Sequence, residues 1–380
     1  MTKILIPIET APGERRVSAT PGAVKRLKSL GCDVFVESSA GELSGFNDFL
    51  YKESGGEIVS TSNKSIWEDV DVVFCVQTPS DSNLGNLKKG AILLGLLDPY
   101  ANENLQKTIT SNKISALSLE LLPRISRAQS SDVLSSQANI AGYKAVLLAA
   151  SELDRYFPML MTAAGTVQPA KVVVLGGGVA GLQAVATAKR LGAIVFVSDI
   201  RPAVKEQVES LGARFIELPE IDEKPSESGG YAKSVTPEFL SKQKTTLTKY
   251  LSEADVAVCT AQVLGKKAPV LIDSHMIEKM RPGSVVIDLA VSQGGNCEGT
   301  KANETIVCNG VKLIGAGELP SSVPYDASTL YAKNLTSLIT PFIKDGVINL
   351  DKEDELISGC LLSDEGVILQ NKVFEKWGLN

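Results

Sequence analysis

A glycine-rich segment in the middle of the 380-residue chain has the residue types and the spacing that bind phosphate. The apolar run 171–175 leads into it, and a helix-like run from Leu182 to Leu191 follows. In this order of elements the first glycine permits a tight turn, the second lets the backbone approach a pyrophosphate, and the third lets helix and strand pack closely. Unpaired N–H groups at the start of the helix would bind the phosphates. The residues assigned to this site are Gly176, Gly178, Val179, Ala180 and Gly181.

An acidic residue stands where it would select between the two nicotinamide dinucleotides. Asp199 follows the strand-like run 194–198 and would accept hydrogen bonds from the ribose hydroxyls of the adenosine. Its carboxylate would also repel a 2′-phosphate, so the sequence favours NAD(H) over NADP(H). Arg201 is a signal in the opposite direction, because an arginine at this point can bind the 2′-phosphate.

A polar stretch, 124–132, precedes an apolar helix-like run and has two interpretations. In the first, Asp132 caps the helix and the arginines face solvent. In the second, the stretch is a loop that faces a cleft at a domain interface, where ligands are often bound. The residues alone leave both open.

Composition excludes several classes of function. The net charge is −6 with no long basic run, which argues against a nucleic-acid groove. The chain has one histidine, His275, and six scattered cysteines without a C-x-x-C pair, so no metal site is expected and the thiols should be free. The N-terminus does not resemble a signal peptide, and no apolar run reaches the roughly 18–20 residues of a membrane span. We therefore expect a cytoplasmic chain.

A repeated pattern of helix, glycine and strand predicts the fold class. Helix-like runs end in Leu-Gly at Gly31, Gly192 and Gly212, and a short β-rich run follows each one. Such alternation predicts an α/β fold with two Rossmann-like domains, each with a parallel sheet, joined by long helices. Thr20 and Pro21 form a helix start signal. The expected strands are 3–6, 34–36, 72–76, 91–94 and 115–119 in the first domain, and 171–175, 194–198, 214–216, 256–259, 285–288 and 312–314 in the second.

Two long helices are expected to connect the domains. The Ala- and Leu-rich run 133–157 is interpreted as one helix, and 330–343 as another. The first domain would then comprise 1–135 and about 325–380, and the nucleotide-binding domain 136–324. The segment 217–237, rich in proline and charge, is a solvated loop or a lid over the nucleotide.

The sequence resembles the NAD(H)-binding component of proton-translocating transhydrogenases over nearly its whole length. The resemblance includes the glycine-rich segment and the segments 161–166, 205–212 and 294–297, and its most specific mark is the arginine–glutamine–aspartate loop at 124–132. It implies that Arg124, Gln129 and Asp132 hold the nicotinamide end and shape the hydride-transfer site. The further positions that it implies near the cofactor are Ile125, Ser126, Ser130, Ser131 and Ser135, then Asp199, Ile200 and Arg201 at the ribose, and Gly230, Tyr231, Gln243 and Gln262 beside the nucleotide.

The resemblance also implies an activity and partners. In that family, hydride passes between NADH and NADP⁺, the NADP(H) is held on a partner subunit, and the reaction is coupled to proton translocation by membrane subunits. The chain would lie at the inner membrane through those partners. The helix expected at 133–157 could support a homodimer, as is common in the family.

Alanine dehydrogenases are relatives with the same two-domain plan and provide the alternative. Oxidation of an amino acid needs groups that bind a carboxylate and move protons. The lysine and histidine that those relatives use correspond here to Gln77 and Asp98, and one of their aspartates to Ser292. Hydride transfer between two nicotinamides needs alignment and no proton donor, so these replacements favour the transhydrogenase interpretation. A non-catalytic NAD(H)-sensing protein is a third possibility.

Overall fold

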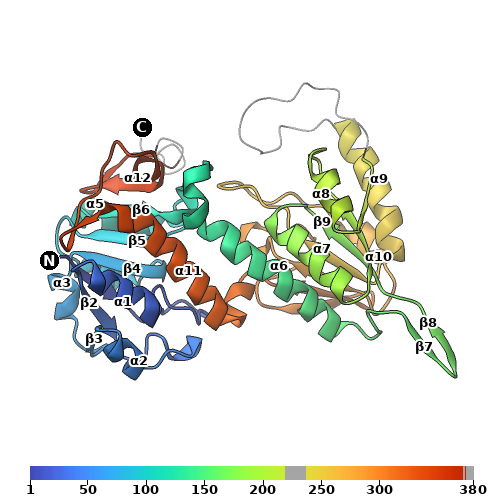
Figure 1. Cartoon of the computed structure of the whole chain (residues 1–380). Coiled ribbons are helices and arrows are strands. Elements are labelled where there is room, and N and C mark those ends of the chain that lie inside the picture. Colours follow the sequence, from blue (N-terminus) through green and yellow to red (C-terminus); the bar gives the residue numbers. More distant parts are fainter. Residues whose placement is uncertain (219–236, 371–372, 374–380) are drawn as a thin grey trace. The chain divides into compact units, whose positions relative to one another are not determined.

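The computed structural model describes residues 1–218, 237–370 and 373, and the chain divides into two compact units (Figure 1). Unit 1 comprises Met1–Gln137 and Ser321–Asn380, and unit 2 comprises Ala138–Pro320. Most of the segment 217–237, which the sequence suggested as a lid, lies outside the described residues. Across the described ranges, no helix combines the length and the apolar character needed to cross a membrane.

The described part of unit 1 is built on an eight-stranded sheet. Six neighbouring strands are parallel, and the two C-terminal strands are added antiparallel at one edge. The buried apolar run 72–76 is typical of a strand that is covered on both faces. In spatial order the strands are β19 (Val367–Ile368), β18 (Leu361–Asp364), β6 (Ser115–Ser118), β5 (Ile92–Leu96), β4 (Val72–Gln77), β1 (Lys3–Ile6), β2 (Asp33–Glu37) and β3 (Glu57–Val59).

Helices cover both faces of this sheet. Side chains alternate along a strand, so Ile4 and Ile6 pack in one core with α1 (Pro21–Ser29) and α11 (Pro324–Ile339), which Figure 1 shows over one face. Leu5 packs in the opposite core with α5 (Glu103–Asn112). The remaining short elements of unit 1 are α2 (Asp48–Glu53), α3 (Ser65–Asp69), α4 (Asp81–Gly85), α12 (Glu355–Cys360), the ribbon of β16 (Ile343–Lys344) and β17 (Val347–Ile348), and 3-10 turns at Glu42–Ser44, Leu119–Leu121, Ser126–Ser131 and Thr340–Phe342. A further 3-10 turn, Leu319–Ser322, includes the last two residues of unit 2 and the first two of the second segment of unit 1.

Unit 2 contains a seven-stranded sheet in its described residues. Six strands are parallel, and β14 is an antiparallel edge strand. In spatial order the strands are β11 (Arg214–Phe215), β10 (Ile194–Ser198), β9 (Lys171–Leu175), β12 (Val256–Cys259), β13 (Val285–Asp288), β15 (Val311–Gly315) and β14 (Thr305–Cys308). The sequence predictions for β9, β10, β12 and β13 are confirmed residue by residue, because each is a continuous apolar run with clear boundaries.

The helices of unit 2 also form two layers. Val172 and Val174 face a core with α6 (Val133–Glu152), α7 (Val179–Arg190) and α8 (Val204–Ser210). Val173 faces the other core, with α9 (Pro237–Glu253) and α10 (Ser274–Lys279). A 3-10 turn, Val291–Gln293, follows β13. The prediction of parallel-dominated, Rossmann-like α/β architecture is confirmed.

Two predicted helices had wrong boundaries. The helix expected at 133–157 ends earlier, at Glu152, and the Phe157 carbonyl beyond its end accepts from Ala170 N at 3.0 Å. The helix expected at 330–343 is α11, which starts at Pro324 and ends at Ile339. Proline suits the first helical position, whereas Pro341 cannot lie in a helix interior.

A short hairpin in unit 2 was not predicted. It consists of β7 (Leu160–Thr162) and β8 (Gly165–Val167), which pair only with each other among the described strands. Met161 is 77% exposed and Met159 is 54% exposed. Both strands are too short for a periodic pattern to reveal them in the sequence.

Candidate functional site

The carboxyl edge of the unit 2 sheet has an open helix N-terminus at its centre. β9 ends at Leu175, and α7 begins at Val179 after a short connection. Gly178 is the N-cap residue, in extended backbone, and it has no side chain to cap the helix. The first N–H groups of an α-helix have no partner within the helix and carry a partial positive charge. This end of α7 is therefore suited to an anion.

The three fingerprint glycines differ in what surrounds them. Gly176 has a positive φ of +106° and turns the chain out of β9. A Cβ at Gly181 would lie 1.9 Å from the carbonyl oxygen of Gly176, so this position holds α7 close to the strand end. At Gly178, by contrast, a Cβ would have no atom of the described chain within 4 Å. The backbone in front of α7 thus borders open space that a side chain would enter.

Asp199, directly after β10, is tied to the glycine turn. Its carboxylate accepts from Gly177 N at 2.7 Å and from Arg201 Nε and NH2 at 3.0 and 2.9 Å. Burial opposes ionisation of this group, yet the hydrogen bonds from Arg201 and Gly177 hold the pKa of Asp199 below its ordinary value. The site therefore presents a carboxylate at neutral pH. Arg201 is bound to this carboxylate, which lowers its availability for a 2′-phosphate.

Helix α6 approaches the start of α7 through a glycine that sequence reasoning missed. A Cβ at Gly142 would lie 2.0 Å from the carbonyl oxygen of Ala180. Any side chain at this position would push α6 away from the first turn of α7. A lone glycine within an apolar helical run was the available signal, because glycine there lowers helix stability unless packing requires it.

Buried polar residues fix the loops beside the glycine turn, and the sequence did not predict this structural role for Asp288 and Asn296. Asp288 is fully buried and accepts from Ala290 N, Asn296 N, Cys297 N and Thr300 Oγ1. Asn296, also fully buried, accepts from Ala261 N and donates to the Ala261 carbonyl. Gln262, which follows Ala261 in the chain, donates from Nε2 to the Leu289 carbonyl at 2.7 Å.

The arginine–glutamine–aspartate loop belongs to unit 1 and includes the 3-10 turn Ser126–Ser131. Asp132 caps α6, because its carboxylate accepts from Ser135 N at 2.9 Å and from Ser135 Oγ at 2.5 Å. Asn334 on α11 donates to the Ser130 carbonyl at 2.8 Å and holds the loop against unit 1. The side chains of Arg124, Ser126, Gln129 and Ser130 are exposed, those of Ile125 and Ser135 are half-buried, and Ser131 is buried. Capping by Asp132 and a solvent-facing Gln129 are thus compatible.

The residues singled out in the sequence fall into two groups. Those at the glycine turn, with Asp199, Ile200, Arg201 and Gln262, lie at the carboxyl edge of the unit 2 sheet. Gln243 is a buried residue of α9, also in unit 2. Those between Arg124 and Ser135 form one continuous stretch of unit 1. Gly230 and Tyr231 lie outside the described residues.

The carboxyl edge of the unit 1 sheet is filled by its own side chains. Glu14 and Arg16 form an ion pair at 2.6 Å, and both are buried. Gln77, at the end of β4, donates to Glu14 at 2.7 Å. Burial opposes ionisation of Glu14, but its bonds with Arg16 lower its pKa to about 2. Glu9 accepts from Val76 N and Gln77 N, yet burial raises its pKa to about 8.

Asp98 lies beside this network in strained backbone. Its φ is +49°, and its N–H donates to Glu120 Oε1 at 2.7 Å. Burial raises the pKa of both carboxyl groups, Asp98 and Glu120. Thus Gln77 is an amide bonded to Glu14, and Asp98 is an aspartate with positive φ.

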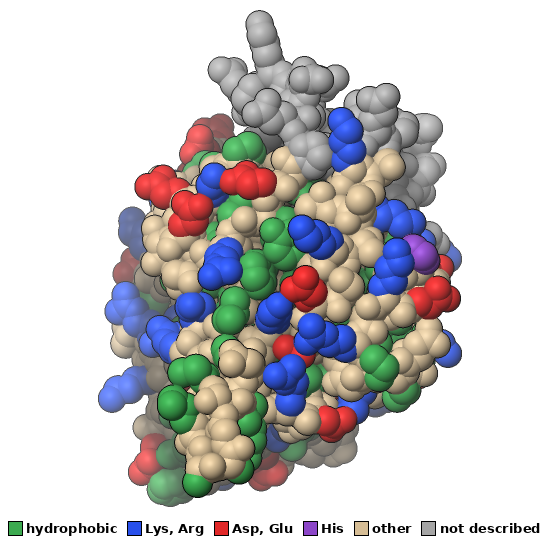
Figure 2. Space-filling model, turned by 90° about the vertical axis from the view of Figure 1, so that its right-hand side faces the viewer, with side chains coloured by type: hydrophobic (Ala, Val, Ile, Leu, Met, Phe, Trp, Pro, Cys, Tyr) green, Lys and Arg blue, Asp and Glu red, His purple; other side chains and the backbone are tan. Residues whose placement is uncertain are grey.

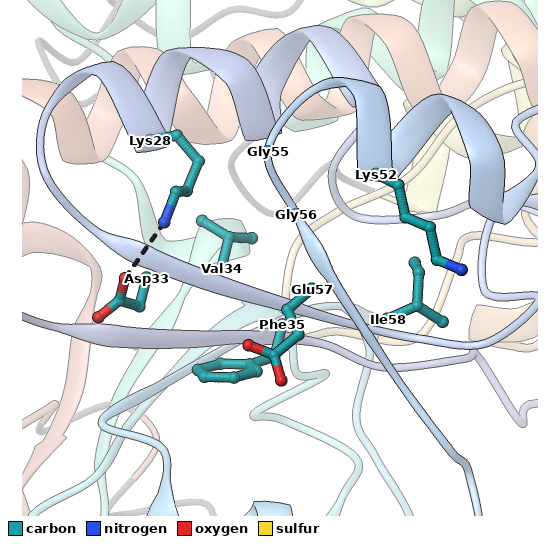
Figure 3. Close-up of a pocket in the computed structure, with 9 residues that line it drawn as sticks. All are labelled: Lys28, Asp33, Val34, Phe35, Lys52, Gly55, Gly56, Glu57 and Ile58. Carbon is teal, nitrogen blue, oxygen red and sulfur yellow. Dashed lines mark hydrogen bonds and ion pairs between the residues drawn. The ribbon is translucent and has the colours of Figure 1, made fainter.

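A cavity of about 410 Å³ lies at the opposite, amino edge of the unit 1 sheet (Figure 3). Lys28 and Lys52 extend over an apolar floor that includes Val34, and Lys28 pairs with Asp33 at 3.1 Å. Cofactors of parallel α/β sheets bind at the carboxyl ends of strands. None of the residues predicted to bind cofactor lines this cavity, so we do not assign it to that role.

Charged groups of both signs share the surface of unit 2. Figure 2 shows a face on which Lys and Arg side chains have Asp and Glu between them. Some oppositely charged side chains of this unit form ion pairs, for example Arg155 with Asp255 at 2.8 Å and Lys171 with Glu253 at 2.7 Å. Within the described residues, no group of three or more His, Cys, Asp or Glu side chains is placed to hold a metal ion.

The chain has close relatives among known proteins. Residues 5–141 match the N-terminal domain of the alanine dehydrogenase/PNT family, and 145–371 match its C-terminal domain. A Rhodospirillum rubrum protein, named as the first part of NAD(P) transhydrogenase subunit alpha, is 48% identical over 375 residues, 97% of each chain. A crystal structure of transhydrogenase from Sinorhizobium meliloti, 41% identical, covers 97% of this chain and 100% of its own with a TM-score of 0.86. An L-alanine dehydrogenase structure, 26% identical, covers 99% of both with a TM-score of 0.81.

Proposed function

The chain belongs to the alanine dehydrogenase/PNT family, and on that premise we propose that it is the NAD(H)-binding component of a proton-translocating transhydrogenase. Its role is to hold NADH so that hydride passes to NADP⁺ on a partner subunit. The single observation that carries this proposal is the carboxyl edge of the unit 2 sheet. There an uncapped helix N-terminus, the open space at Gly178 and the carboxylate of Asp199 occur together.

These groups match the parts of NAD(H) in turn. The N–H groups at the start of α7, from Val179 to Gly181, bind the pyrophosphate, and the space at Gly178 admits it. Asp199 accepts from the adenosine ribose hydroxyls, and its negative charge disfavours a 2′-phosphate. Ile200 and Arg201 flank the ribose, and Gln262 lies near the nucleotide. Gly230, Tyr231 and Gln243 are proposed as further contacts on the basis of the family resemblance.

The loop of unit 1 provides the proposed hydride-transfer residues. Arg124, Gln129 and Asp132 hold the nicotinamide end, and Ile125, Ser126, Ser130, Ser131 and Ser135 lie beside them in sequence. Bound NADH supplies a hydride from C4 of its nicotinamide ring. The chain's own residues need to orient that ring and exclude water, because direct hydride transfer requires alignment and no proton donor. The exposed amide of Gln129 can make such an orienting contact.

The proposal includes partners. A second subunit holds NADP(H), a membrane subunit couples the reaction to proton translocation, and this chain is peripheral at the inner membrane through them. The names of the relatives as "subunit alpha" support a complex of several subunits. We also propose a homodimer, which light scattering of the purified chain would test.

The residues of unit 1 favour this function over alanine dehydrogenation. The carboxyl edge of the unit 1 sheet presents Gln77 and Asp98 where a dehydrogenase of amino acids needs proton-transferring groups. Gln77 already donates to Glu14, and Arg16 is bound by the same carboxylate. Little polar capacity is left there for an incoming amino-acid carboxylate. Formation of NADH from NAD⁺ and alanine by the purified chain would favour the alternative.

The direct test is reconstitution of hydride exchange. The purified chain would be mixed with a separately prepared NADP(H)-binding partner domain, and exchange among NADH, NADP(H) and a nicotinamide analogue would be followed by absorbance. We expect rapid exchange that is lost on Gln129→Ala while NADH remains bound. No exchange by the wild-type chain with NADH bound would contradict the proposal.

A further inference from the structure

The two places where the chain passes between the units are fastened to unit 1 by one buried ion pair. Unit 1 ends its first segment at Gln137 and resumes at Ser321. The ion pair joins Glu14 and Arg16, which are 6% and 4% exposed. Two parallel contacts connect them, Nε to Oε1 at 2.8 Å and NH2 to Oε2 at 2.6 Å.

We call these two places, at Gln137 and at Ser321, the crossings. Each crossing makes its own hydrogen bond to the ion pair. At the first, Arg16 NH1 donates to Gln137 Oε1 at 3.0 Å, and Gln137 Nε2 donates to the Ala327 carbonyl on α11 at 3.1 Å. At the second, the Ser321 hydroxyl accepts from Arg15 N at 2.6 Å, and its single proton is shared between the Gly13 carbonyl at 2.8 Å and Glu14 Oε1 at 3.0 Å. Gln137 and Ser321 are themselves buried. Segments that are distant in sequence therefore meet at one guanidinium–carboxylate pair.

The pair also leads directly to the proposed hydride-transfer loop. Gln137 lies in the second turn of α6, and the same helix is capped at its start by Asp132. The hydrogen bond from Arg16 that holds Gln137 in place therefore also restrains the start of α6, which Asp132 caps. The link from Arg16 to the loop is short and is made of described contacts within unit 1.

Stability alone does not account for such an arrangement. Desolvation of two charges offsets most of their attraction, so a buried ion pair is weak evidence of net stabilisation, and its best-attested use is to fix geometry. Glu14 is saturated by donors from Arg15, Arg16, Gln77 and Ser321. A carboxylate with so many partners has one permitted position, which it imposes on all of them.

We propose that the Glu14–Arg16 pair is a positioning element for hydride transfer, which restrains both connections to unit 2 and the capped start of α6. The inference rests on the proposed function, since it concerns the hydride-transfer loop. It assigns no direct contact with NADH to either residue. Loosening the pair's bonds to the crossings should therefore slow transfer more than it weakens binding.

The test uses the loss of one hydrogen-bonding group at each crossing and a matched control. Gln137→Ala removes the bond from Arg16 and the bond to the Ala327 carbonyl, and Ser321→Ala removes the hydroxyl that contacts Glu14, Gly13 and Arg15 N, while both leave the ion pair intact. Gln77→Ala is the control, because it removes a bond to Glu14, shorter at 2.7 Å than the 3.0 Å bonds of the crossings, from β4, which is not a crossing. For each full-length variant, NADH affinity, the rate of hydride exchange with the partner domain, and deuterium uptake at 133–142 and 317–327 would be measured.

We expect Gln137→Ala and Ser321→Ala to slow hydride exchange about tenfold, because small misplacements of reacting groups have effects of that order or larger. Deuterium uptake at the two crossings should rise, and NADH affinity should stay within about threefold. Gln77→Ala should change all three measurements less than either crossing variant does. Unchanged transfer and uptake in the crossing variants would overturn the inference, as would an equal loss in Gln77→Ala. If the wild type exchanges no hydride but uptake changes as expected, the proposed function fails while the anchoring of the crossings stands.

Discussion

The carboxyl edges of the two parallel sheets offer the same topological position and fill it in opposite ways. In unit 2 the position holds glycines, an uncapped helix N-terminus and open space at Gly178. In unit 1 it holds the buried pair of Glu14 and Arg16, with Gln77 bonded to it. Parallel α/β sheets bind ligands at this edge because loops and helix N-termini converge there. The difference teaches that topology creates the position, whereas side-chain volume and hydrogen-bond saturation decide whether a ligand can enter.

The largest effect should come from breaking the close approach on which the open edge depends. Gly181→Ala places a Cβ against the Gly176 carbonyl, and rigid backbone cannot yield, so we expect the free energy of unfolding to fall by about 3 kcal/mol. Urea unfolding would measure this. Gly178→Ala is the matched control, since its Cβ meets no described atom and stability should change by about 1 kcal/mol or less.

The same two variants should distinguish an effect on folding stability from an effect on NADH binding. Gly178→Ala should weaken NADH binding about tenfold or more, because its Cβ occupies the space proposed for the pyrophosphate. Titration by NADH fluorescence would measure the affinity. Full affinity in Gly178→Ala would show that the phosphates do not lie in front of α7.

A somewhat smaller effect is expected at the carboxylate of the open edge. Asp199→Asn removes the negative charge that accepts from the ribose and holds Arg201. A hydrogen bond to a charged group contributes about 1.5–3 kcal/mol, so NADH affinity should fall about tenfold to a hundredfold. NADPH binding should improve in relative terms, because Arg201 is released. Competition between the two dinucleotides checks this, and an unchanged preference would remove Asp199 from the proposed role.

The smallest changes, counted per pH unit, should distinguish two glutamates of the filled edge by the sign of their pH dependence. Glu9 has a folded-state pKa raised to about 8, so the folded state binds the extra proton and stability should fall as pH rises from about 4.5 to 8. Glu14 has its pKa lowered to about 2, so its contribution should be lost as pH falls from about 4.5 towards 2. One proton corresponds to at most about 1.4 kcal/mol per pH unit.

Urea unfolding across this pH range, with Glu9→Gln as the comparison, would measure the first effect. The decline between about pH 5 and 8 should be less steep in the variant than in the wild type. If Glu9→Gln and the wild type decline in parallel, the carboxyl group of Glu9 is not the group that titrates.

The sequence predicts a helix or strand best where a single local pattern determines it. The strands β9, β10, β12 and β13 are buried, mainly apolar runs, and their limits were predicted without error. Gly31, Gly192 and Gly212 have the positive φ that a glycine after a helix implies. Helix ends were predicted less well: α6 ends before the expected residue, and for α11 Pro324 and Pro341 were given too little weight against apolar composition.

The site was predictable in its local parts and not in its tertiary parts. The glycine turn and Asp199 are close in sequence, so their association could be read from spacing. The roles of Gly142 and Asn296 depend on segments that are brought together only by folding. The Glu14–Arg16 network likewise joins residues more than a hundred positions apart, Arg16 with Gln137 and Glu14 with Ser321. No periodicity or motif in a single sequence encodes such pairs.

The central claim is that the dinucleotide binds at the open edge of unit 2 and not at the filled edge of unit 1. Calorimetric titration of the purified chain with NADH tests it most directly, with wild type, Asp199→Asn and Gln77→Ala compared. We predict one NADH per chain, with affinity strongly reduced by Asp199→Asn and unchanged by Gln77→Ala. A second NADH per chain, or one whose affinity depends on Gln77 and not on Asp199, would contradict the account.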